Sequence, residues 1–361
     1  MSPNTPSSLG SIPASDPNRL GLLFRAEAPH LPWQGRIIDA HTHIADVEAA
    51  EAYFAVAQWF NVERTCSQTP LEQVDAIDER FPGRLAFVAV PDYHNPDKRK
   101  IVSRDWLERI ERFAEKGVKL AKFWAAPRGL EIVGPDMRLD SSIRLEAMRL
   151  AHRLGMNFMV HVADPDTWFA THYRDRYRFG TKPEHYEPLE RLLDRYSDVK
   201  WLAAHMAGHP EDLDHVQRLL DRYPHLHVDT SATKWMVREL SKQPQRFAEF
   251  CRANPGRVLF GTDIVATRAN RSETLYASRF WSLRTMLETD YEGPSPIVDP
   301  DLPLIDPAMP PDATATLRGA NLDSATLAML YTGAAERFFG SEASEAVAAA
   351  RLPAAVPAAG R

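Results

Sequence analysis

The stretch IDAHTHI, residues 38–44, places two histidines at the end of an apolar run. Side chains on a β-strand alternate between its two faces, so His41 and His43 are expected to project from the same face. Two neutral imidazoles on one face are good ligands for a divalent metal. Two unrelated polar residues at a strand end are the alternative, because short motifs often match by chance. The rest of the chain has to decide between the two.

Short apolar, β-branched runs recur along the chain, with helical patterns between them. Residues 103–117, 140–155 and 184–197 carry apolar residues at spacings of three and four, as amphipathic helices do. Alternation of this kind predicts parallel strands joined by right-handed crossovers. Eight strand segments predict an α/β fold, the (β/α)8 TIM barrel; they are 36–41, 62–65, 84–90, 118–124, 156–161, 199–205, 225–230 and 257–263.

The composition of the regions outside these segments predicts the domain organisation. We expect one barrel domain over residues 34–340 and an irregular, loosely ordered N-terminal extension over residues 1–33. Residues 341–361 are expected to form an Ala/Pro-rich tail. Residues 291–315 are crowded with prolines and are predicted to be a long surface loop.

Charge and cysteine content exclude several classes of function. The chain has 361 residues, of which 44% are hydrophobic, and a formal net charge of −6. There is no dense basic run, so a nucleic-acid partner is not expected. No secretory signal and no apolar stretch of about 18 residues is present, so we expect no membrane partner. Only Cys66 and Cys251 occur, which favours a reducing cytoplasm. A homodimer is the default expectation for a cytoplasmic enzyme.

The polar residues at the ends of the predicted strands indicate where chemistry takes place. A barrel has its active site at the C-terminal ends of its strands. Metal-competent side chains end four of the eight segments, namely His41 with His43 just after it, His161, His205 and Asp263, and the segment 118–124 carries Lys119 and Lys122. Polar groups on inward-facing strands are costly without partners, so this convergence predicts a functional site rather than core packing.

Four motifs occur in the order IDAHTHI, VHVADP (160–165), AAHMAG (203–208) and LFGTDI (259–264). In this order the chain resembles the metal-dependent amidohydrolase superfamily, and within it the branch that contains aminocarboxymuconate-semialdehyde decarboxylase. The resemblance implies a divalent metal, which we expect to be a single zinc ion, held by His41, His43, His161 and Asp263. It also implies that His205 handles protons or holds the substrate, and that Asp263 takes a proton from water. Ala207 stands where relatives usually have a glycine.

Three further residues are candidates for contacts with the substrate or with the metal ligands. Lys119 and Lys122 are three apart, so on a regular strand only one can point into the barrel, and Lys122 is nearer its end. Lys122 could bridge two metals as a carboxylated lysine, as in some members of the superfamily, or pair with a substrate carboxylate or a nearby acid. Arg128 could bind a substrate carboxylate. Asp39 could orient a ligand histidine.

The expected activity is that of a metal-dependent hydrolase. Zinc lowers the pKa of bound water to about 7, and that activated water would cleave a C–N or C–O bond in a small amide, lactone or ester. The alternative is metal-dependent, non-oxidative decarboxylation of an aromatic or unsaturated acid. Residues 164–188 are expected to form the main specificity loop, with aromatics suited to a ring and arginines suited to an anion. A barrel that binds without catalysis is the rival from another class.

Overall fold

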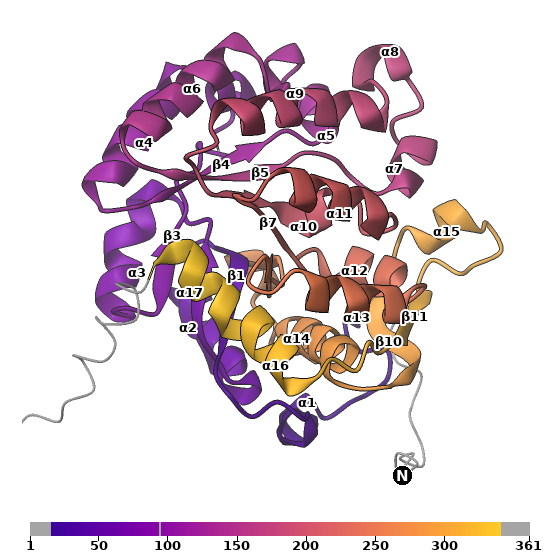
Figure 1. The fold of residues 1–361 in the computed structure, drawn as a ribbon. Helices are drawn as coiled ribbons and strands as arrows, with labels where there is room; N and C mark the ends of the chain where they lie inside the picture. Colours follow the sequence, from indigo (N-terminus) through magenta and orange to yellow (C-terminus); the bar gives the residue numbers. More distant parts are fainter. Residues whose placement is uncertain (1–15, 94, 341–361) are drawn as a thin grey trace, which may run out of the picture.

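The computed structural model describes residues 16–93 and 95–340, and all eight predicted strand segments contain strands (Figure 1). A ninth short strand, β9, follows directly after the eighth. The strands are β1 Ile37–Ile44, β2 Val62–Ser67, β3 Leu85–Phe87, β4 Leu120–Trp124, β5 Asn157–His161, β6 Trp201–Ala203, β7 Leu226–Asp229, β8 Val258–Leu259 and β9 Ile264–Ala266.

These strands are parallel and lie in two sheets, in the orders β3-β2-β1-β9 and β4-β5-β6-β7-β8. Backbone hydrogen bonds join the sheets on both sides. On one side Ala89 donates to the carbonyl of Leu120 at 2.8 Å. On the other, Ala40 donates to the carbonyl of Phe260 at 2.7 Å. The strands therefore follow one another in sequence order, as the predicted α/β barrel requires.

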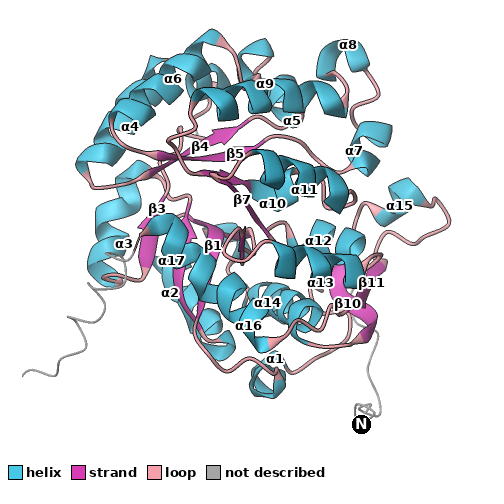
Figure 2. Ribbon diagram, in the orientation of Figure 1, coloured by secondary structure: helices cyan, strands magenta, loops and turns pink. Residues whose placement is uncertain are grey.

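Helices alternate with the strands and cover their outer faces (Figure 2). In α4, for example, Ser103 caps the first turn, and Trp106, Ile110 and Phe113 form the buried stripe expected from the spacing. The main helices are α2 Val47–Ala57, α3 Val74–Arg80, α4 Arg104–Glu115, α6 Ser142–Arg153, α9 Lys182–Arg195, α11 Leu213–Arg222, α12 Thr233–Leu240, α13 Pro244–Ala253 and α14 Glu273–Glu288. Shorter helices are α1 Phe24–Glu27, α5 Arg128–Ile132, α7 Asp166–Thr171, α8 Arg176–Phe179, α10 Ala204–Ala207, α15 Leu302–Ile305, α16 Ser324–Ala328 and α17 Ala334–Phe339.

The proline-rich segment 291–315 is not the irregular loop that the sequence predicts. It contains β10 (Glu292–Val298), which pairs antiparallel with β11 (Thr314–Arg318), and the short helix α15 lies between them. The register is irregular between Pro294 and Val298, where Pro296 has no N–H to donate. The pair forms a separate two-stranded sheet, and prolines are tolerated where a strand has an open edge.

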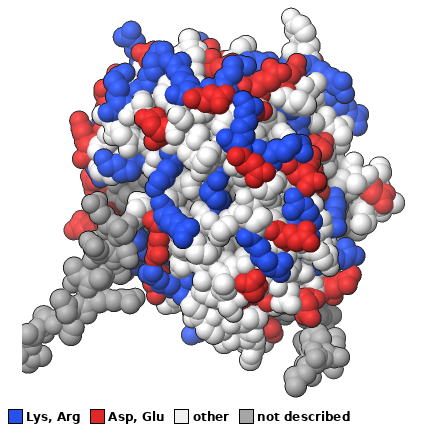
Figure 3. Space-filling view, viewed as in Figure 1, with Lys and Arg blue, Asp and Glu red and all other residues white. Residues whose placement is uncertain are grey.

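The described part of the N-terminal extension packs on the barrel domain. Phe24 of α1 is buried, and its ring lies 6.4 Å from that of Trp281 on α14. Residues 1–15 and the predicted tail, 341–361, lie outside the described residues. On the face in Figure 3, basic and acidic side chains are interspersed. Among the described helices, none combines the length and apolar character that crossing a bilayer would demand.

Candidate active site

A cavity of about 670 Å³ opens at the C-terminal ends of the strands. The residues that the sequence places at those ends line it together: His41, His43, Lys122, His161, His205 and Asp263. The topology therefore brings side chains that are up to 222 positions apart in sequence to one place (41 to 263). This is the convergence that the barrel prediction required.

His41, His43 and Asp263 form the centre of the cluster. Oδ1 of Asp263 lies 3.1 Å from Nε2 of His43 and 3.6 Å from Nε2 of His41. His41 is buried, whereas about a third of the His43 side chain is exposed. Two imidazole nitrogens and a carboxylate oxygen thus face one point from β1 and from the turn after β8.

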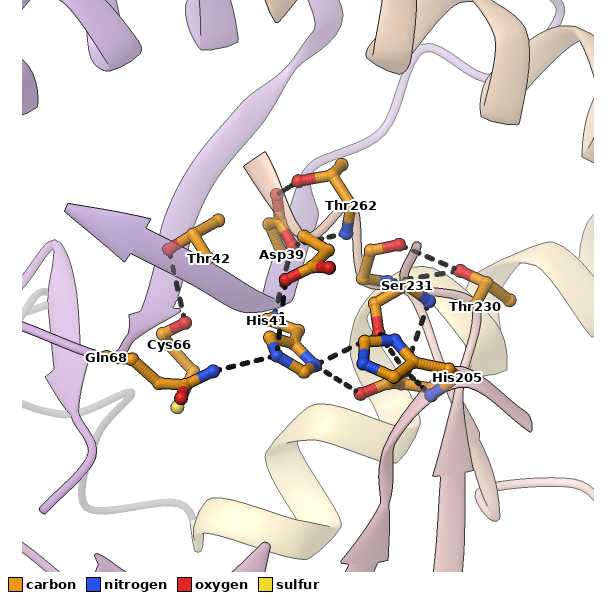
Figure 4. Close-up of polar contacts among 12 residues, drawn as sticks. Asp39, His41, Thr42, Cys66, Gln68, His205, Thr230, Ser231 and Thr262 are labelled. Atoms are coloured by element: carbon orange, nitrogen blue, oxygen red, sulfur yellow. Dashed lines mark hydrogen bonds and ion pairs between the residues drawn. The ribbon is translucent and has the colours of Figure 1, made fainter. Parts of the chain in front are cut away.

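A carboxylate from another strand fixes the orientation of the His41 ring. Asp229, the last residue of β7, accepts a hydrogen bond from Nδ1 of His41 at 2.9 Å. With the proton on Nδ1, the lone pair of Nε2 faces His43 and Asp263. Ser231 also contacts Nδ1, at 3.0 Å, and Figure 4 shows His41 between Gln68 and the Ser231–His205 pair.

His161 and His205 complete the histidine cluster. Nε2 of His161 contacts Oδ1 of Asp164 at 2.8 Å, and Nδ1 of His205 contacts Oγ of Ser231 at 2.7 Å. The two rings meet edge to face with centroids 4.4 Å apart, and His205 stacks on His41 at 5.1 Å. In each ring one nitrogen is held by a neighbouring oxygen, which leaves Nδ1 of His161 and Nε2 of His205 for the site.

The backbone that carries His205 is left-handed over four consecutive residues. The φ angles of His205, Met206, Ala207 and Gly208 are +59°, +53°, +56° and +72°. This conformation costs a residue with a Cβ about 1–2 kcal/mol. Gly208 is required here, because a Cβ would lie 2.1 Å from the carbonyl oxygen of Ala163. Asp263 also has a positive φ, +59°, so strain is concentrated at the site.

Asp39 does not hold a histidine ring, contrary to the orienting role considered from the sequence. Its Oδ1 accepts from the backbone N–H groups of His41 at 3.2 Å and Thr262 at 3.0 Å. Its Oδ2 accepts from the hydroxyls of Tyr53 at 2.9 Å and Thr262 at 2.7 Å. The side chain is fully buried beneath the ligands and fixes the backbone of β1 and of the turn before Asp263. Ring orientation falls to Asp229 instead.

Of the two basic residues considered from the sequence, Lys122 lies in the cavity and Arg128 does not. Lys122 is buried and lines the cavity, whereas Lys119 is exposed, as the strand alternation predicted. Arg128 is exposed at the start of α5 and is not among the residues that line the cavity. The chain turns after β4 through buried Ala125 and Ala126, and this turn carries Arg128 away from the site.

Sequence reasoning missed Asp229, Gln68 and Ser231. Asp229 lies one residue before the end of the predicted strand 225–230, so a search of strand ends for polar residues could have found it. Nε2 of the Gln68 amide lies 2.8 Å from Nε2 of His41 and 3.1 Å from Nε2 of His43. Gln68 follows β2, but a lone glutamine carries no motif, so no sequence signal singles it out.

Burial and neighbouring charge set the protonation of these groups. Burial, and next the charges of His161 and His41, lower the pKa of His205 well below its ordinary value, so the ring is neutral at pH 7. Burial lowers the pKa of Lys122 to about 8. Burial alone would raise the pKa of Asp263, but the hydrogen bond from His43 and the nearby imidazoles outweigh it and lower that pKa.

This donor set fits a divalent metal. Imidazole nitrogens and a carboxylate oxygen are ligands that zinc and other divalent transition metals accept. Among residues 16–93 and 95–340, the atoms of His41, His43 and Asp263 lie within 4.8 Å of one another. The carboxylate partners of His41 and His161 are the kind of outer contacts that metal-ligating histidines usually have.

Comparison with protein families agrees with this chemistry. The model of the amidohydrolase family matches residues 34–341. The chain belongs to the amidohydrolase family. Comparison with curated protein sequences gives no match.

The solved structures that are similar to this chain include three with named reactions. One is a probable 2-pyrone-4,6-dicarboxylic acid hydrolase from Acinetobacter baumannii, 11% identical, covering 84% of this chain and 99% of that one, with a TM-score of 0.49. Another is a 2,6-dihydroxybenzoate decarboxylase, 12% identical, covering 85% and 99%, with a TM-score of 0.49. A third is a 5-carboxyvanillate decarboxylase from Novosphingobium aromaticivorans, complexed with manganese, 13% identical, covering 85% and 96%, with a TM-score of 0.42.

Proposed function

We propose that this amidohydrolase-family enzyme is a zinc-dependent hydrolase that cleaves a C–N or C–O bond of a small amide, lactone or ester. The observation that carries the proposal is the convergence of Nε2 of His41, Nε2 of His43 and Oδ1 of Asp263 at the floor of the cavity. His41, His43, Asp263 and the free nitrogen of His161 would hold the metal. When bound, zinc supplies acidified water and polarises a substrate oxygen.

Asp263 and His205 are suited to proton transfer in this reaction. The pKa of Asp263 lies below its usual range, so its carboxylate is ionised and can accept a proton from attacking water. Neutral His205 donates through Nδ1 to Ser231, which leaves Nε2 as a proton acceptor facing the cavity. The proton that Asp263 accepts could pass to Nε2 of His205, and His205 would then protonate the leaving nitrogen or oxygen.

Decarboxylation is the second candidate, and the placement of Lys122 favours it. A substrate carboxylate that is lost as carbon dioxide must first be held by cations. Lys122 is a buried cation inside the cavity, and within the described part of the chain it makes no hydrogen bond or ion pair. Arg128, the other cation considered for this role, lies outside the cavity.

The decisive experiment measures metal content per chain by elemental mass spectrometry. We expect about one metal in the wild type, loss of it in His161→Ala and retention in Lys122→Ala. Lys119→Ala, which removes an exposed lysine directly before the same strand, is the matched control. About two metals, with one lost in Lys122→Ala, would indicate a lysine-bridged pair. No metal after reconstitution with zinc or manganese would overturn the proposal.

The two reactions are then separated by their products. A panel of lactones, esters and amides is assayed for acid release, and a panel of aromatic carboxylates for carbon dioxide. Acid release that depends on His205 and Asp263 supports hydrolysis. Carbon dioxide release without any hydrolysis would replace it with the decarboxylase.

A further inference from the structure

The cavity wall carries basic side chains in addition to the residues proposed to hold the metal. Five basic side chains line it: Lys98, Arg109, Lys122, Lys234 and Arg279. Two of them are already engaged. Lys98 donates to the carbonyl oxygen of Tyr93 at 2.7 Å, and Arg109 forms two hydrogen bonds to Glu72, at 2.7 and 3.2 Å. Lys122 lies beside the proposed metal ligands, so Lys234 and Arg279 remain to be explained.

Lys234 and Arg279 have no carboxylate partner among the described residues. Arg279 donates only to its own helix, to Oγ of Ser278 at 2.9 Å and to the carbonyl of Leu275 at 3.4 Å. Lys234 makes no hydrogen bond and no ion pair within residues 16–93 and 95–340. One acid on this wall, Asp301, already accepts from Arg238 at 3.0 Å and from two tryptophans.

This arrangement is costly in the empty cavity. Burial lowers the pKa of Lys234, and the charge of Arg279 lowers it further. Burial lowers the pKa of Arg279 to about 10, with no opposing contribution from an acid. Asp299 and Asp301 offset part of the shift of Lys234, but both acids already pair with Arg238, so an anion between the two cations would lower the remaining cost.

Lys234 is next in sequence to a tryptophan that contacts the histidine cluster. Lys234 directly precedes Trp235, whose ring meets those of His205 and His161 edge to face at 5.7 and 6.2 Å. Trp168, from the predicted specificity loop, packs on Trp235 at 5.4 Å. Both indoles donate to Oδ2 of Asp301, at 2.9 and 3.2 Å, so their orientation is fixed. The two indoles therefore line the same cavity as the histidine cluster and the two cations.

We propose that Lys234 and Arg279 form the subsite for a carboxylate group of the substrate, and that Trp168 and Trp235 contact its apolar body. The substrate class is then a small carboxylate that carries an aromatic ring or another flat apolar group. This inference rests on the proposed function for the identity of the site as an active site. Arginine suits this role because its guanidinium binds a carboxylate through two parallel hydrogen bonds.

The test compares benzoate with its neutral isostere benzamide, measured by isothermal titration calorimetry on the purified enzyme and on zinc-stripped enzyme. Lys234→Met and Arg279→Met should each weaken benzoate binding about tenfold or more, and change benzamide binding less than twofold. Lys98→Met is the matched control, because it removes a cavity lysine whose ammonium is already engaged. It should leave benzoate affinity within twofold.

Several results would overturn the inference. They are equal affinity of the wild type for benzoate and benzamide, unchanged benzoate binding in both variants, or an equal loss in Lys98→Met. If circular dichroism shows that Arg279→Met does not fold, the inference is tested instead with Lys234→Met and with Arg279→Lys, which preserves the charge. Arg279→Lys should then retain benzoate binding within about threefold.

Failure of this subsite and failure of the proposed function give different results. Benzoate binding that disappears on zinc removal, yet ignores Lys234 and Arg279, places the anion at the metal and refutes only the subsite. Binding that depends on both cations in a protein without metal supports the subsite and refutes the proposed zinc hydrolase.

Discussion

Replacing Asp229 by asparagine should weaken metal binding although Asp229 is not a proposed ligand. Its two oxygens accept four hydrogen bonds. Oδ2 accepts from Nδ1 of His41 at 2.9 Å. Oδ1 accepts from the backbone N–H groups of His205 at 2.8 Å and Ser231 at 3.1 Å, and from the hydroxyl of Ser231. The carboxylate is fully buried, so water cannot substitute for a lost partner.

Asparagine has one carbonyl oxygen and one NH₂ group, so it cannot satisfy these donors. If its oxygen keeps the two backbone N–H groups, its NH₂ faces Nδ1 of His41. The imidazole must then carry its proton on Nε2, and the lone pair that would bind the metal is lost. The opposite rotamer leaves the NH₂ group against two backbone donors.

The size of the effect follows from these contacts. Loss of an outer partner of a metal-ligating histidine typically weakens metal affinity 10–100-fold, which is about 1.4–2.7 kcal/mol. Leaving a buried donor unpaired costs a further 1–3 kcal/mol of folding stability, as an order of magnitude. Burial would raise the pKa of Asp229, yet His41, His205 and Ser231 together outweigh burial and lower that pKa.

Zinc affinity is measured by competition with a chromogenic chelator, and stability by denaturant unfolding. The matched control is Asp198→Asn. Asp198 contacts His152 at 2.8 Å in a pair of the same chemistry, but that pair is exposed on the surface. The control should bind zinc as the wild type does. Zinc affinity of Asp229→Asn within twofold of the wild type would refute the reasoning.

Three further predictions concern pH, backbone strain and metal. Burial, and next Arg257, lower the pKa of His227 to about 4, so protonation favours the unfolded state and stability falls as pH drops from 6.5 towards 4. At pH 5 the loss is about 2 kcal/mol, and His227→Gln should remove this part of the difference between pH 5 and pH 7.5 in urea unfolding. Ala207→Gly relieves a positive φ, so it should change the free energy of unfolding by 0 to about +1 kcal/mol. The control Ala147→Gly, inside α6, should lower that free energy by at least about 1 kcal/mol. Equal losses in the two variants would contradict the strain argument. Zinc at a hundredfold excess over its dissociation constant should stabilise the wild type by about 2.7 kcal/mol in thermal unfolding, and a similar gain in His43→Ala would show that zinc binds elsewhere.

The proline-rich segment shows one limit of the local pattern. Prolines 294 and 296 indicate a loop when residues are read in order, because proline cannot donate to a strand ladder. In the fold, β10 pairs with only one neighbour, β11, and tolerates them there. The loop between these strands carries Asp301, which orients Trp168 and Trp235. A residue from a segment predicted to be irregular thus shapes the cavity.

The barrel and the residues at its rim follow from local patterns along the chain. Strand and helix periodicities are local, and parallel strands in sequence order bring their C-terminal ends together whatever the details of packing. His41, His43, His161, His205, Lys122 and Asp263 could therefore be assigned to one cavity from their positions alone.

How these side chains are held, and which other side chains face them, depends on contacts between segments far apart in the sequence. The pairing of His41 with Asp229 joins residues 188 positions apart. It depends on how the strands β1 and β7 are oriented relative to each other in the barrel. Arg128 is exposed outside the cavity, while Lys234 and Arg279, which follow no motif, line it and have no carboxylate partner within residues 16–93 and 95–340. Charge compensation is a property of neighbours in space, so no local pattern could distinguish these cations from the solvated ones.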